Sequence, residues 1–433
     1  MQIIISKKRI FAALYNLSVI FFFVMTYNLF LTIILILLAD FGLERYLAFL
    51  NIKNAKKDLP EILRDIYDPQ KYKEQQNYFR TNSRFGMLTS TFSFIIILSM
   101  ILFGGFSWVD RIVQIYVHHQ IWTPILFFGV LFFANDIISI PFDIYDTFVI
   151  EQKFGFNKVT PKLFVLDKLK GYGLTAIIGG GILFIIISIY NWTPDYFWLL
   201  AWAVITIFSL FMILFYSEII VPLFNKQTPL QEGDLRTEIE KFAIKSGFNL
   251  TNIFVIDGSK RSTKANAYFS GLGNKKRIVL YDTLMDKLTT QEIVAVLAHE
   301  VGHYKLKHTL INYLVSIPTT LILFYVFGLI LKSDSLAQAL GGNVASFQLN
   351  TIAFSILYSP ISLVLDIFTN VLSRKFEYQA DAYAAKYGYA LELQSGLKKL
   401  SATSLSNLMP HPLNVFFHYS HPTLYQRIIK LNP

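Results

Sequence analysis

The residues with the clearest chemical potential lie in a short stretch, Ala298–His303, which reads Ala-His-Glu-Val-Gly-His. On a helix, His299 and His303 share one face because they are four residues apart, and the Glu300 carboxylate lies between them. Two imidazoles at this spacing are typical ligands of a catalytic zinc ion, and the glutamate is the usual general base. The alternative is a pair of ordinary surface histidines. It is disfavoured because polar clusters in a chain as apolar as this one are usually functional.

A third ligand must come from elsewhere in the chain, because a catalytic zinc ion takes three protein ligands and leaves one position for water. The chain has no Cys, so this ligand is a His, an Asp or a Glu. Glu377 and Asp381 are four residues apart and therefore share a helix face. We expect Glu377 to bind the ion and Asp381 to accept the N–H of a ligating imidazole. A solvated helix face is the alternative for this pair.

A capped helix is expected to position the two histidines. Thr289 and Glu292 form a capping-box pattern, and the apolar residues after them continue at helical spacing into His299. The segment before this helix is expected to fold as a small α+β unit in which the strands form a hairpin or a meander. Its predicted elements are a helix at Gly233–Gly247, a buried strand at Ile253–Ile256, and strands at Asn266–Ser270 and Arg277–Tyr281 joined around Gly271 and Gly273.

The composition places the chain in a membrane. Of its 433 residues, 54% are hydrophobic and 16% are charged, which excludes disordered, fibrous and small secreted proteins. The absence of Cys excludes disulfides, thiolate metal sites and a cysteine nucleophile. We interpret the net charge of +10 as anchoring beside the membrane, and we expect contact with lipid and no nucleic-acid partner.

Seven apolar windows approach the roughly 20 residues that a helix needs to cross a bilayer. An odd number places the termini on opposite sides. The longer connections and the tail from Ser373 then lie on the same side of the membrane, and they carry nearly all Lys and Arg. This side is predicted to be cytoplasmic, although Lys7, Lys8 and Arg9 on the other side oppose the assignment. The windows are Ile10–Ala39, Phe85–Trp108, Ile121–Ile140, Gly171–Tyr190, Tyr196–Val221, Thr309–Leu331 and Thr351–Leu372.

This topology brings the candidate ligands together. The sixth span is expected to begin just after His303 and the seventh to end just before Glu377, so two crossings return the chain to the same membrane surface. We therefore predict an all-α polytopic membrane protein with a small α+β cytoplasmic insertion. Its expected parts are 1–221 with five spans, 222–308 with the α+β insertion and the zinc-binding helix, 309–372 with two spans, and 373–433 as a cytoplasmic helical tail.

These features resemble the type one family of CAAX prenyl proteases, integral membrane zinc metalloproteases that act on prenylated C-terminal peptides. The resemblance covers most of the chain and implies seven helices that enclose a large chamber in the membrane, with the zinc site facing its interior on the cytoplasmic side. The sequence differs from the family in having no obvious C-terminal retention signal and no Cys. The resemblance rests on Ala298–His303, Glu377–Asp381, Pro141-Phe142-Asp143 to Phe154–Lys158, Ser259–Ser262 to Asn266–Phe269, and Ser420-His421-Pro422 to Arg427.

The function that we expect is zinc-dependent hydrolysis of a peptide bond, with one Zn²⁺ per chain. His299, His303 and Glu377 would hold the ion, and Glu300 would accept a proton from the bound water and pass it to the leaving amine. The expected substrate is a prenylated protein or a similar membrane-associated peptide. The abundance of Ile, Lys and Asn is typical of bacteria, which indicates an inner membrane, or the endoplasmic reticulum membrane if the chain is eukaryotic.

The strand Asn266–Phe269 is predicted to be a sheet edge beside the zinc-binding helix, where it could hold an extended peptide through main-chain hydrogen bonds. The resemblance implies a substrate-binding role for Asn266, and we extend it to Ala267 and Tyr268. An ordinary hairpin strand is the alternative.

The tail contributes two further candidates. Pro422 prevents a helix from simply continuing through His421, and the resemblance places this tail against the active site. We expect His421 to stabilise the oxyanion that forms during hydrolysis, the alternatives being a fourth metal ligand or a packing residue. Arg427 is expected to hold the tail in place or to bind a substrate carboxylate, with a plain surface arginine as the alternative.

Two other functions fit parts of the sequence. A transporter or channel with a structural metal would show internal repeats, and Gly179–Gly181 in the fourth span is the one interruption that favours it. A quality-control protease of membrane proteins would share the metal pattern.

Four polar residues inside the spans either line a chamber or pair between helices, and these are Asn135, Asp136, Asp366 and Asn370.

Overall fold

The computed structural model describes residues 2–55, 58–248, 253–271 and 277–432, with the backbone alone for residues 2–23. Its helices are α1 (Gln2–Asn54), α2 (Pro69–Leu102), α3 (Gly105–Tyr116), α4 (Trp122–Tyr145), α5 (Pro161–Leu174), α6 (Gly180–Trp192), α7 (Phe197–Phe215), α8 (Val221–Phe224), α9 (Asp234–Ser246), α10 (Asp282–Met285), α11 (Thr290–Lys305), α12 (His308–Ile330), α13 (Asp334–Ala339), α14 (Phe347–Lys386), α15 (Ala390–Thr403), α16 (Pro412–His418) and α17 (Leu424–Leu431). Its strands are β1 (Gln227–Pro229), β2 (Ile253–Ile256), β3 (Ala267–Ser270) and β4 (Arg277–Tyr281). Short π-helical turns continue α4, α5 and α7 at Asp146–Glu151, Thr175–Gly179 and Tyr216–Ile220.

Seven helices within the described residues are long and apolar enough to cross a membrane, which confirms the predicted number. One predicted span is too long. Leu102 ends α2, and Gly104 adopts a left-handed conformation with φ of 65° before α3 begins, so Trp108 lies on a separate helix. The spans are Val24–Asn54, Pro69–Leu102, Trp122–Glu151, Pro161–Trp192, Phe197–Phe224, His308–Ile330 and Phe347–Lys386.

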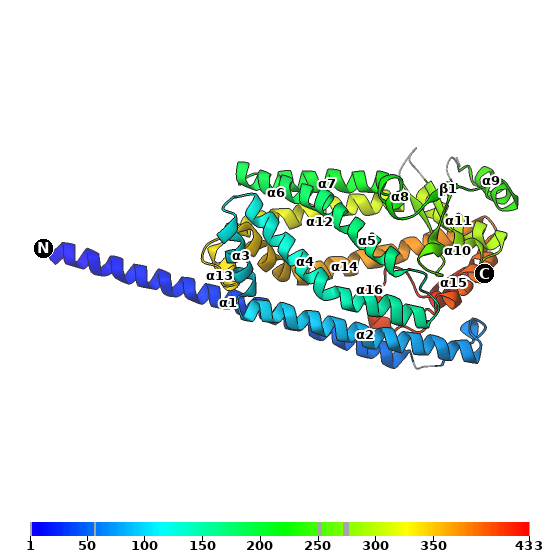
Figure 1. Cartoon of the computed structure of the whole chain (residues 1–433), viewed down its shortest axis with the longest axis horizontal. Coiled ribbons are helices and arrows are strands. Elements are labelled where there is room, and N and C mark those ends of the chain that lie inside the picture. The colour runs from blue at the N-terminus through cyan, green and yellow to red at the C-terminus, as the bar shows by residue number, and fades with distance from the viewer. Residues whose placement is uncertain (1, 56–57, 249–252, 272–276, 433) are drawn as a thin grey trace.

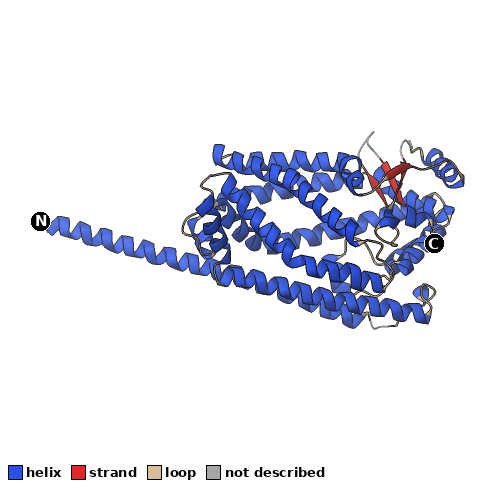
Figure 2. Cartoon of the chain, viewed as in Figure 1, coloured by secondary structure: helices blue, strands red, loops and turns tan. Residues whose placement is uncertain are grey.

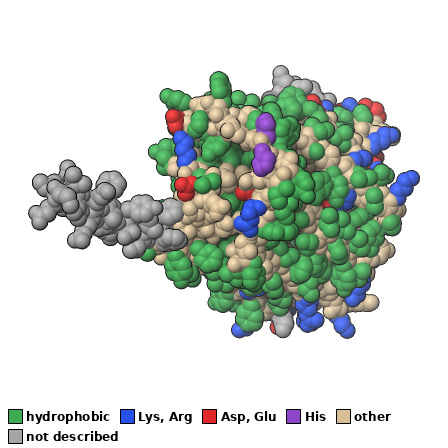
Figure 3. Space-filling model, turned by 60° about the vertical axis from the view of Figure 1, so that its left-hand side comes forward, with side chains coloured by type: hydrophobic (Ala, Val, Ile, Leu, Met, Phe, Trp, Pro, Cys, Tyr) green, Lys and Arg blue, Asp and Glu red, His purple; other side chains and the backbone are tan. Residues whose placement is uncertain are grey.

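The membrane helices leave much of their surface accessible. In five of the seven spans, only 6% of the most apolar window is buried inside the protein. A solid bundle would bury the inner face of every helix, so this exposure is what helices around a chamber require. Figure 3 shows hydrophobic side chains over most of the face in view, as contact with lipid demands.

The polar residues of the spans divide between their two expected roles. Asp136 on α4 pairs with Lys168 on α5 at 2.7 Å and thereby joins two helices. Asn370 donates to a backbone carbonyl of the C-terminal tail at 2.9 Å. By contrast, Asn135 lines a cavity of about 480 Å³ among α2, α3 and α4. Asp366 lines a cavity of about 610 Å³ among α1, α12 and α14.

The α+β unit lies with the C-terminus at one end of the bundle, and the N-terminus lies at the other end (Figure 1). Figure 2 shows the strands of this unit in red, at the same end of the molecule as the C-terminus. Their order in the sheet is β1-β2-β4-β3. β3 and β4 form the predicted antiparallel hairpin, although residues 272–276, with Gly273, lie outside the described residues. The alternative of a meander is wrong because β2 pairs with β4 in parallel. The sequence does not predict β1, because three residues are too few to show an alternating pattern.

One hydrophobic core joins this sheet to the helix of the two histidines. It is built from buried side chains of α9, β2, β4, α11 and α15. Because these elements share a core, β3 and α11 are held in a fixed relation to each other. Its fully buried members include Ile239, Phe242, Leu280, Leu284, Val294, Leu297 and Leu393.

The seventh membrane helix was expected to end before Glu377, but it continues beyond this residue. α14 continues without interruption from Phe347 to Lys386, so Glu377 and Asp381 both lie on it and the expected boundary at 372 falls inside a helix. Hydropathy detects where an apolar window ends, whereas the helix continues because its next turns pack against α11.

A glycine allows α11 and α14 to approach closely. A Cβ atom placed on Gly302 would lie 3.0 Å from Cβ of Tyr383 and 3.1 Å from Cα of Ala380. Any larger residue at this position would push the two helices apart. Helix packing thus accounts for the glycine that directly precedes His303 on α11.

We predict that the two termini lie on opposite sides of the membrane, because the described spans are odd in number. Epitope tags fused to the N-terminus and to the C-terminus should differ in protease accessibility in sealed vesicles, and detergent should expose both. Equal protection of the two tags would contradict the seven-span topology.

Candidate metal centre and active site

The start of α11 is fixed by the predicted capping box. The Glu292 carboxylate accepts from the backbone N–H of Thr289 at 2.8 Å, and the Thr289 hydroxyl accepts from the N–H of Glu292. Lys399 on α15 also binds this carboxylate at 2.6 Å. Although burial opposes ionisation, these contacts hold the pKa of Glu292 below its usual value. The helix of the two histidines is therefore anchored to the tail at its first turn.

Three of the predicted residues converge on one point. His299 Nε2 lies 3.1 Å from His303 Nε2, and the Glu377 carboxylate lies 3.5 Å from the first ring and 3.3 Å from the second. Among the described residues, this is the one group of three or more His and acidic side chains whose ligand atoms all lie within 4.8 Å. α11 supplies two members and α14 the third, which is the arrangement predicted for a metal centre.

Asp381 occupies the position expected of an outer partner. Its Oδ1 lies 2.8 Å from His299 Nδ1, so Nδ1 donates, and in the neutral imidazole Nε2 then carries a lone pair toward Glu377. Burial disfavours a charged imidazole, but the hydrogen bonds with Asp381 and Glu377 outweigh burial and raise the pKa of His299 to about 9. The site therefore has a strong preference for positive charge.

The chemistry of the group fits a divalent metal ion. A lone pair of His299 faces a carboxylate, and two acceptors of this kind repel each other unless a cation lies between them. Two neutral imidazoles and one carboxylate are also the ligand set of many catalytic zinc sites.

The side chain of Arg427 contacts Asp381, and it also lines the cavity that opens at this site. Its guanidinium donates to both carboxylate oxygens at 2.9 and 2.6 Å, and its side chain is only 11% exposed. Burial opposes the charge, but the hydrogen bonds with Asp381 keep the pKa of Arg427 above its usual value. These contacts support the expectation that Arg427 holds the tail, and its binding of a substrate carboxylate stays a prediction. Removal of one partner from such a buried pair typically costs about 3–5 kcal/mol.

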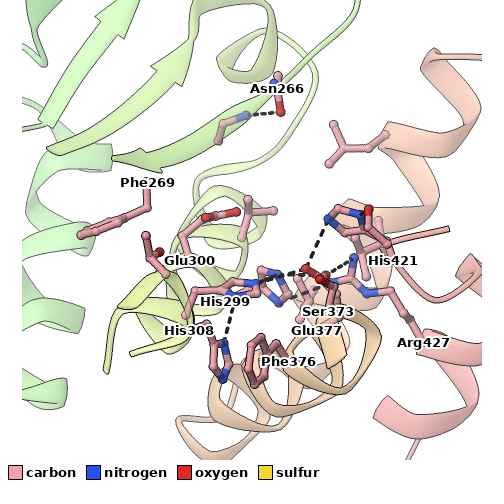
Figure 4. Close-up of a pocket in the computed structure, with 18 of the residues that line it drawn as sticks. Asn266, Phe269, His299, Glu300, His308, Ser373, Phe376, Glu377, His421 and Arg427 are labelled. Atoms are coloured by element: carbon pink, nitrogen blue, oxygen red, sulfur yellow. Dashed lines mark hydrogen bonds and ion pairs between the residues drawn. The ribbon is translucent and has the colours of Figure 1, made fainter. Parts of the chain in front are cut away.

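A cavity of about 410 Å³ opens in front of the three converging side chains. Glu300 lines it and lies on the side of the imidazoles that faces β3 (Figure 4). His421 lines it from the opposite wall, 3.3 Å from Glu377 Oε1, with 65% of its side chain exposed. His421 does not belong to the converging group, which argues against the alternative of a fourth metal ligand.

The strand β3 is an edge of the sheet, as predicted, and one side of its backbone is free. The carbonyl of Asn266 accepts from Tyr281 N–H, so alternate residues direct their backbone groups toward β4. Ala267 and Phe269 alternate with Asn266 along the strand, so their backbone groups point away from β4, to the open edge. Both residues line the cavity. The side chain of Asn266 accepts from the N–H of Ala267 at 2.9 Å (Figure 4).

Tyr268 differs from the expectation. Its side chain lies on the other face of β3, 3.3 Å from the hydroxyl of Ser217, and does not line the catalytic cavity. Successive side chains of a strand point to opposite faces, so Ala267 and Tyr268 cannot both face the cavity. Phe269 lines the cavity where Tyr268 was expected to do so. The two-residue periodicity of a strand, counted from Ala267, is the signal that could have identified Phe269.

Ion pairs fix this strand to the membrane helices. Lys264, three residues before Ala267, binds the Glu151 carboxylate at 2.7 Å and the Tyr78 hydroxyl at 2.9 Å. Arg261 donates two hydrogen bonds of 2.9 Å to Asp167. The α+β unit is thus attached to α2, α4 and α5, and sequence reasoning did not find these contacts because the partners are distant in the chain.

The two halves of the chain match two family models. Residues 48–226 match the model described as CAAX prenyl protease N-terminal, five membrane helices, and residues 229–433 match peptidase family M48. The CAAX prenyl protease 1 homolog of Arabidopsis thaliana is 36% identical over 86% of this chain and 89% of its own length. CAAX prenyl protease 1 of Saccharomyces cerevisiae is 34% identical over 91% and 93%. The chain belongs to the CAAX prenyl protease 1 family.

A solved structure extends this family assignment to the fold. The crystal structure of S. mikatae Ste24p matches with a TM-score of 0.89 and 33% identity, covering 94% of this chain and 99% of that one. Membership in the CAAX prenyl protease 1 family confirms the resemblance found in the sequence and makes the chain a multi-pass membrane metalloprotease.

The positions of the ligands predict different consequences for two carboxylates. Glu377→Ala should lower the metal content of the purified protein, because one of three ligands is lost. Glu300→Gln should keep metal near one ion per chain and abolish cleavage, because every ligand remains. Elemental analysis beside a cleavage assay checks both variants. Normal metal content in the first, or substantial turnover in the second, would show that these roles are wrong.

Proposed function

We propose that this protein is a zinc-dependent endopeptidase that cleaves C-terminal peptides from prenylated CAAX proteins or from similar membrane-associated peptides. The observation that carries this proposal is a three-ligand centre that opens into a cavity beside a free strand edge. The relatives from Arabidopsis thaliana and Saccharomyces cerevisiae are CAAX prenyl proteases by name, which supports the substrate class.

In the proposed mechanism, His299, His303 and Glu377 hold one Zn²⁺. When bound, zinc supplies a Lewis acid and an acidified water. Glu300 accepts the proton of the attacking water and later delivers it to the leaving amine, a transfer that its place in the cavity wall permits. Asp381 fixes the ring of His299 and Arg427 offsets the negative charge of Asp381, so the tail supports the ligands from behind.

The peptide would bind as an additional strand on β3. The backbone carbonyl of Ala267 and the backbone groups of Phe269 are placed for main-chain hydrogen bonds, and the Asn266 side chain, which accepts from the N–H of Ala267, lies at the end of that edge. Main-chain pairing holds an extended peptide with little regard to its side chains. We therefore expect the strand to set the register of the peptide and the cavity to select its residues.

The proposed location follows from the same geometry. The site lies at the end of the bundle with the C-terminus, and the connections at this end carry most of the positive charge of the sequence. We propose that this end is cytoplasmic, in contact with anionic lipid, in a bacterial inner membrane or the endoplasmic reticulum membrane.

The substrate class is tested by a comparison of three substrates with purified protein in lipid vesicles. We expect cleavage of a farnesylated C-terminal peptide, slower cleavage of the same peptide without the lipid, and loss of both after chelation of zinc. An unfolded membrane protein is the third substrate. Its cleavage in preference to the farnesylated peptide would instead support the quality-control function.

His421 provides a test of the oxyanion role. A donor aimed at a developing oxyanion is typically worth about 3 kcal/mol, so His421→Ala should lower kcat by roughly two decades and change KM little. The variant should retain zinc and lose its preference for a phosphinic transition-state analogue. His418→Ala serves as a control, since His418 is a tail histidine that pairs with Glu44 instead. Unchanged kcat or loss of zinc would refute the assignment.

A further inference from the structure

A third histidine, outside the recognised pattern, contacts one of the two ligand histidines. His308 is the first residue of α12 and is 3% exposed. Figure 4 shows His308 beside Phe376 below the converging ligands. Nδ1 of His308 lies 3.0 Å from Nδ1 of His303, and Nε2 of His308 lies 3.0 Å from Oε1 of Gln379 on α14. Three side chains from three helices therefore form one continuous line of hydrogen bonds that ends at the converging ligands.

The donors and acceptors along this line can be assigned in order. The amide oxygen of Gln379 only accepts, so Nε2 of His308 donates to it. A neutral imidazole has one donor and one acceptor, which makes Nδ1 of His308 an acceptor. Nδ1 of His303 must then donate, and Nε2 of His303 keeps its lone pair. That atom is the one that faces Glu377 and His299.

The backbone and the packing fix His308 in this position. The ring of Phe376 stacks on His308 with centroids 4.1 Å apart and planes 9° apart. Lys307 adopts a left-handed conformation with φ of 60°, and this turn between α11 and α12 brings His308 back toward His303. Phe376, Glu377 and Gln379 lie on one turn of α14. A single helix therefore supplies the ring that stacks on His308, the ligand carboxylate and the amide oxygen that accepts from His308.

We propose that Gln379 and His308 form a relay that holds His303 in the tautomer with a proton on Nδ1 and presents Nε2 to the metal ion. His308 is thus a positioning residue for His303, as Asp381 is for His299. The inference rests on the proposed metal centre. The two relays differ in charge, because Asp381 is anionic whereas His308 and Gln379 are neutral. The relay orients a ligand without adding negative charge to the site.

The experiment is a titration of the metal-stripped, full-length protein with Zn²⁺ against a chromophoric chelator. His308→Phe keeps an aromatic ring for stacking and removes the acceptor, so it should weaken zinc binding by about 10–100-fold. His308→Asn restores an acceptor, because its Oδ1 lies as many bonds from the backbone as Nδ1 of histidine, and should remain within about 3-fold of wild type. Thermal unfolding of the metal-free proteins monitors the fold.

A second pair of variants tests the far end of the relay. Gln379→Leu removes the acceptor for His308 and should weaken zinc binding by about 10-fold, whereas Gln379→Glu retains an acceptor and should not. His418→Asn changes a histidine outside this line and should leave binding unchanged.

The outcomes separate the relay from the metal centre. Wild-type zinc affinity in both His308→Phe and Gln379→Leu would overturn the relay, as would equal losses in His308→Phe and His308→Asn, which would indicate packing alone. If Glu377→Ala binds Zn²⁺ as tightly as the wild-type protein, the proposed metal centre itself is wrong.

Discussion

The close contact between α11 and α14 is the constraint on which the rest of the site depends. Gly302 lies against Ala380, and a Cβ atom at this position would lie 3.1 Å from Cα of Ala380, so a side chain here would require the helices to shift. The contact sets the distance between the two histidines of one helix and Glu377 of the other to within reach of a single ion. The same helix α14 places the Asp381 carboxylate against His299 and the Gln379 amide against His308.

Two membrane crossings connect the parts of the site. α12 and α14 cross the bundle and return, so the ligands on α11 and α14 are separated by two spans in the chain. A bound ion would therefore join the α+β unit to the last membrane helix. The same helices leave much of their surface open, while a shared core and ion pairs hold β3, the strand proposed to bind the peptide, in place beside the cavity.

Charge balance explains why the tail folds back on the site. Glu377 and Asp381 place two carboxylates in a buried region, and burial of this kind is unfavourable without compensation. Arg427 supplies it with two hydrogen bonds to Asp381. The tail helix α17 is thus part of the centre, and His421, which precedes it, is brought to the open side of the cavity.

The sequence by itself was enough to predict which side chains converge and how many spans the chain has: helical spacing and the order of the spans pointed to His299, His303 and Glu377, and apolar windows indicated seven spans. The hairpin and the edge position of β3 also followed from strand patterns. Only the tertiary structure decided that α14 continues past Glu377, that Tyr268 faces away from the cavity, and that Arg427 binds Asp381. Local patterns report periodicity and hydropathy, whereas these features depend on which surfaces meet. For the same reason His308 carried no assigned role in the sequence: its contacts with His303 and Gln379 exist only once three helices are packed together.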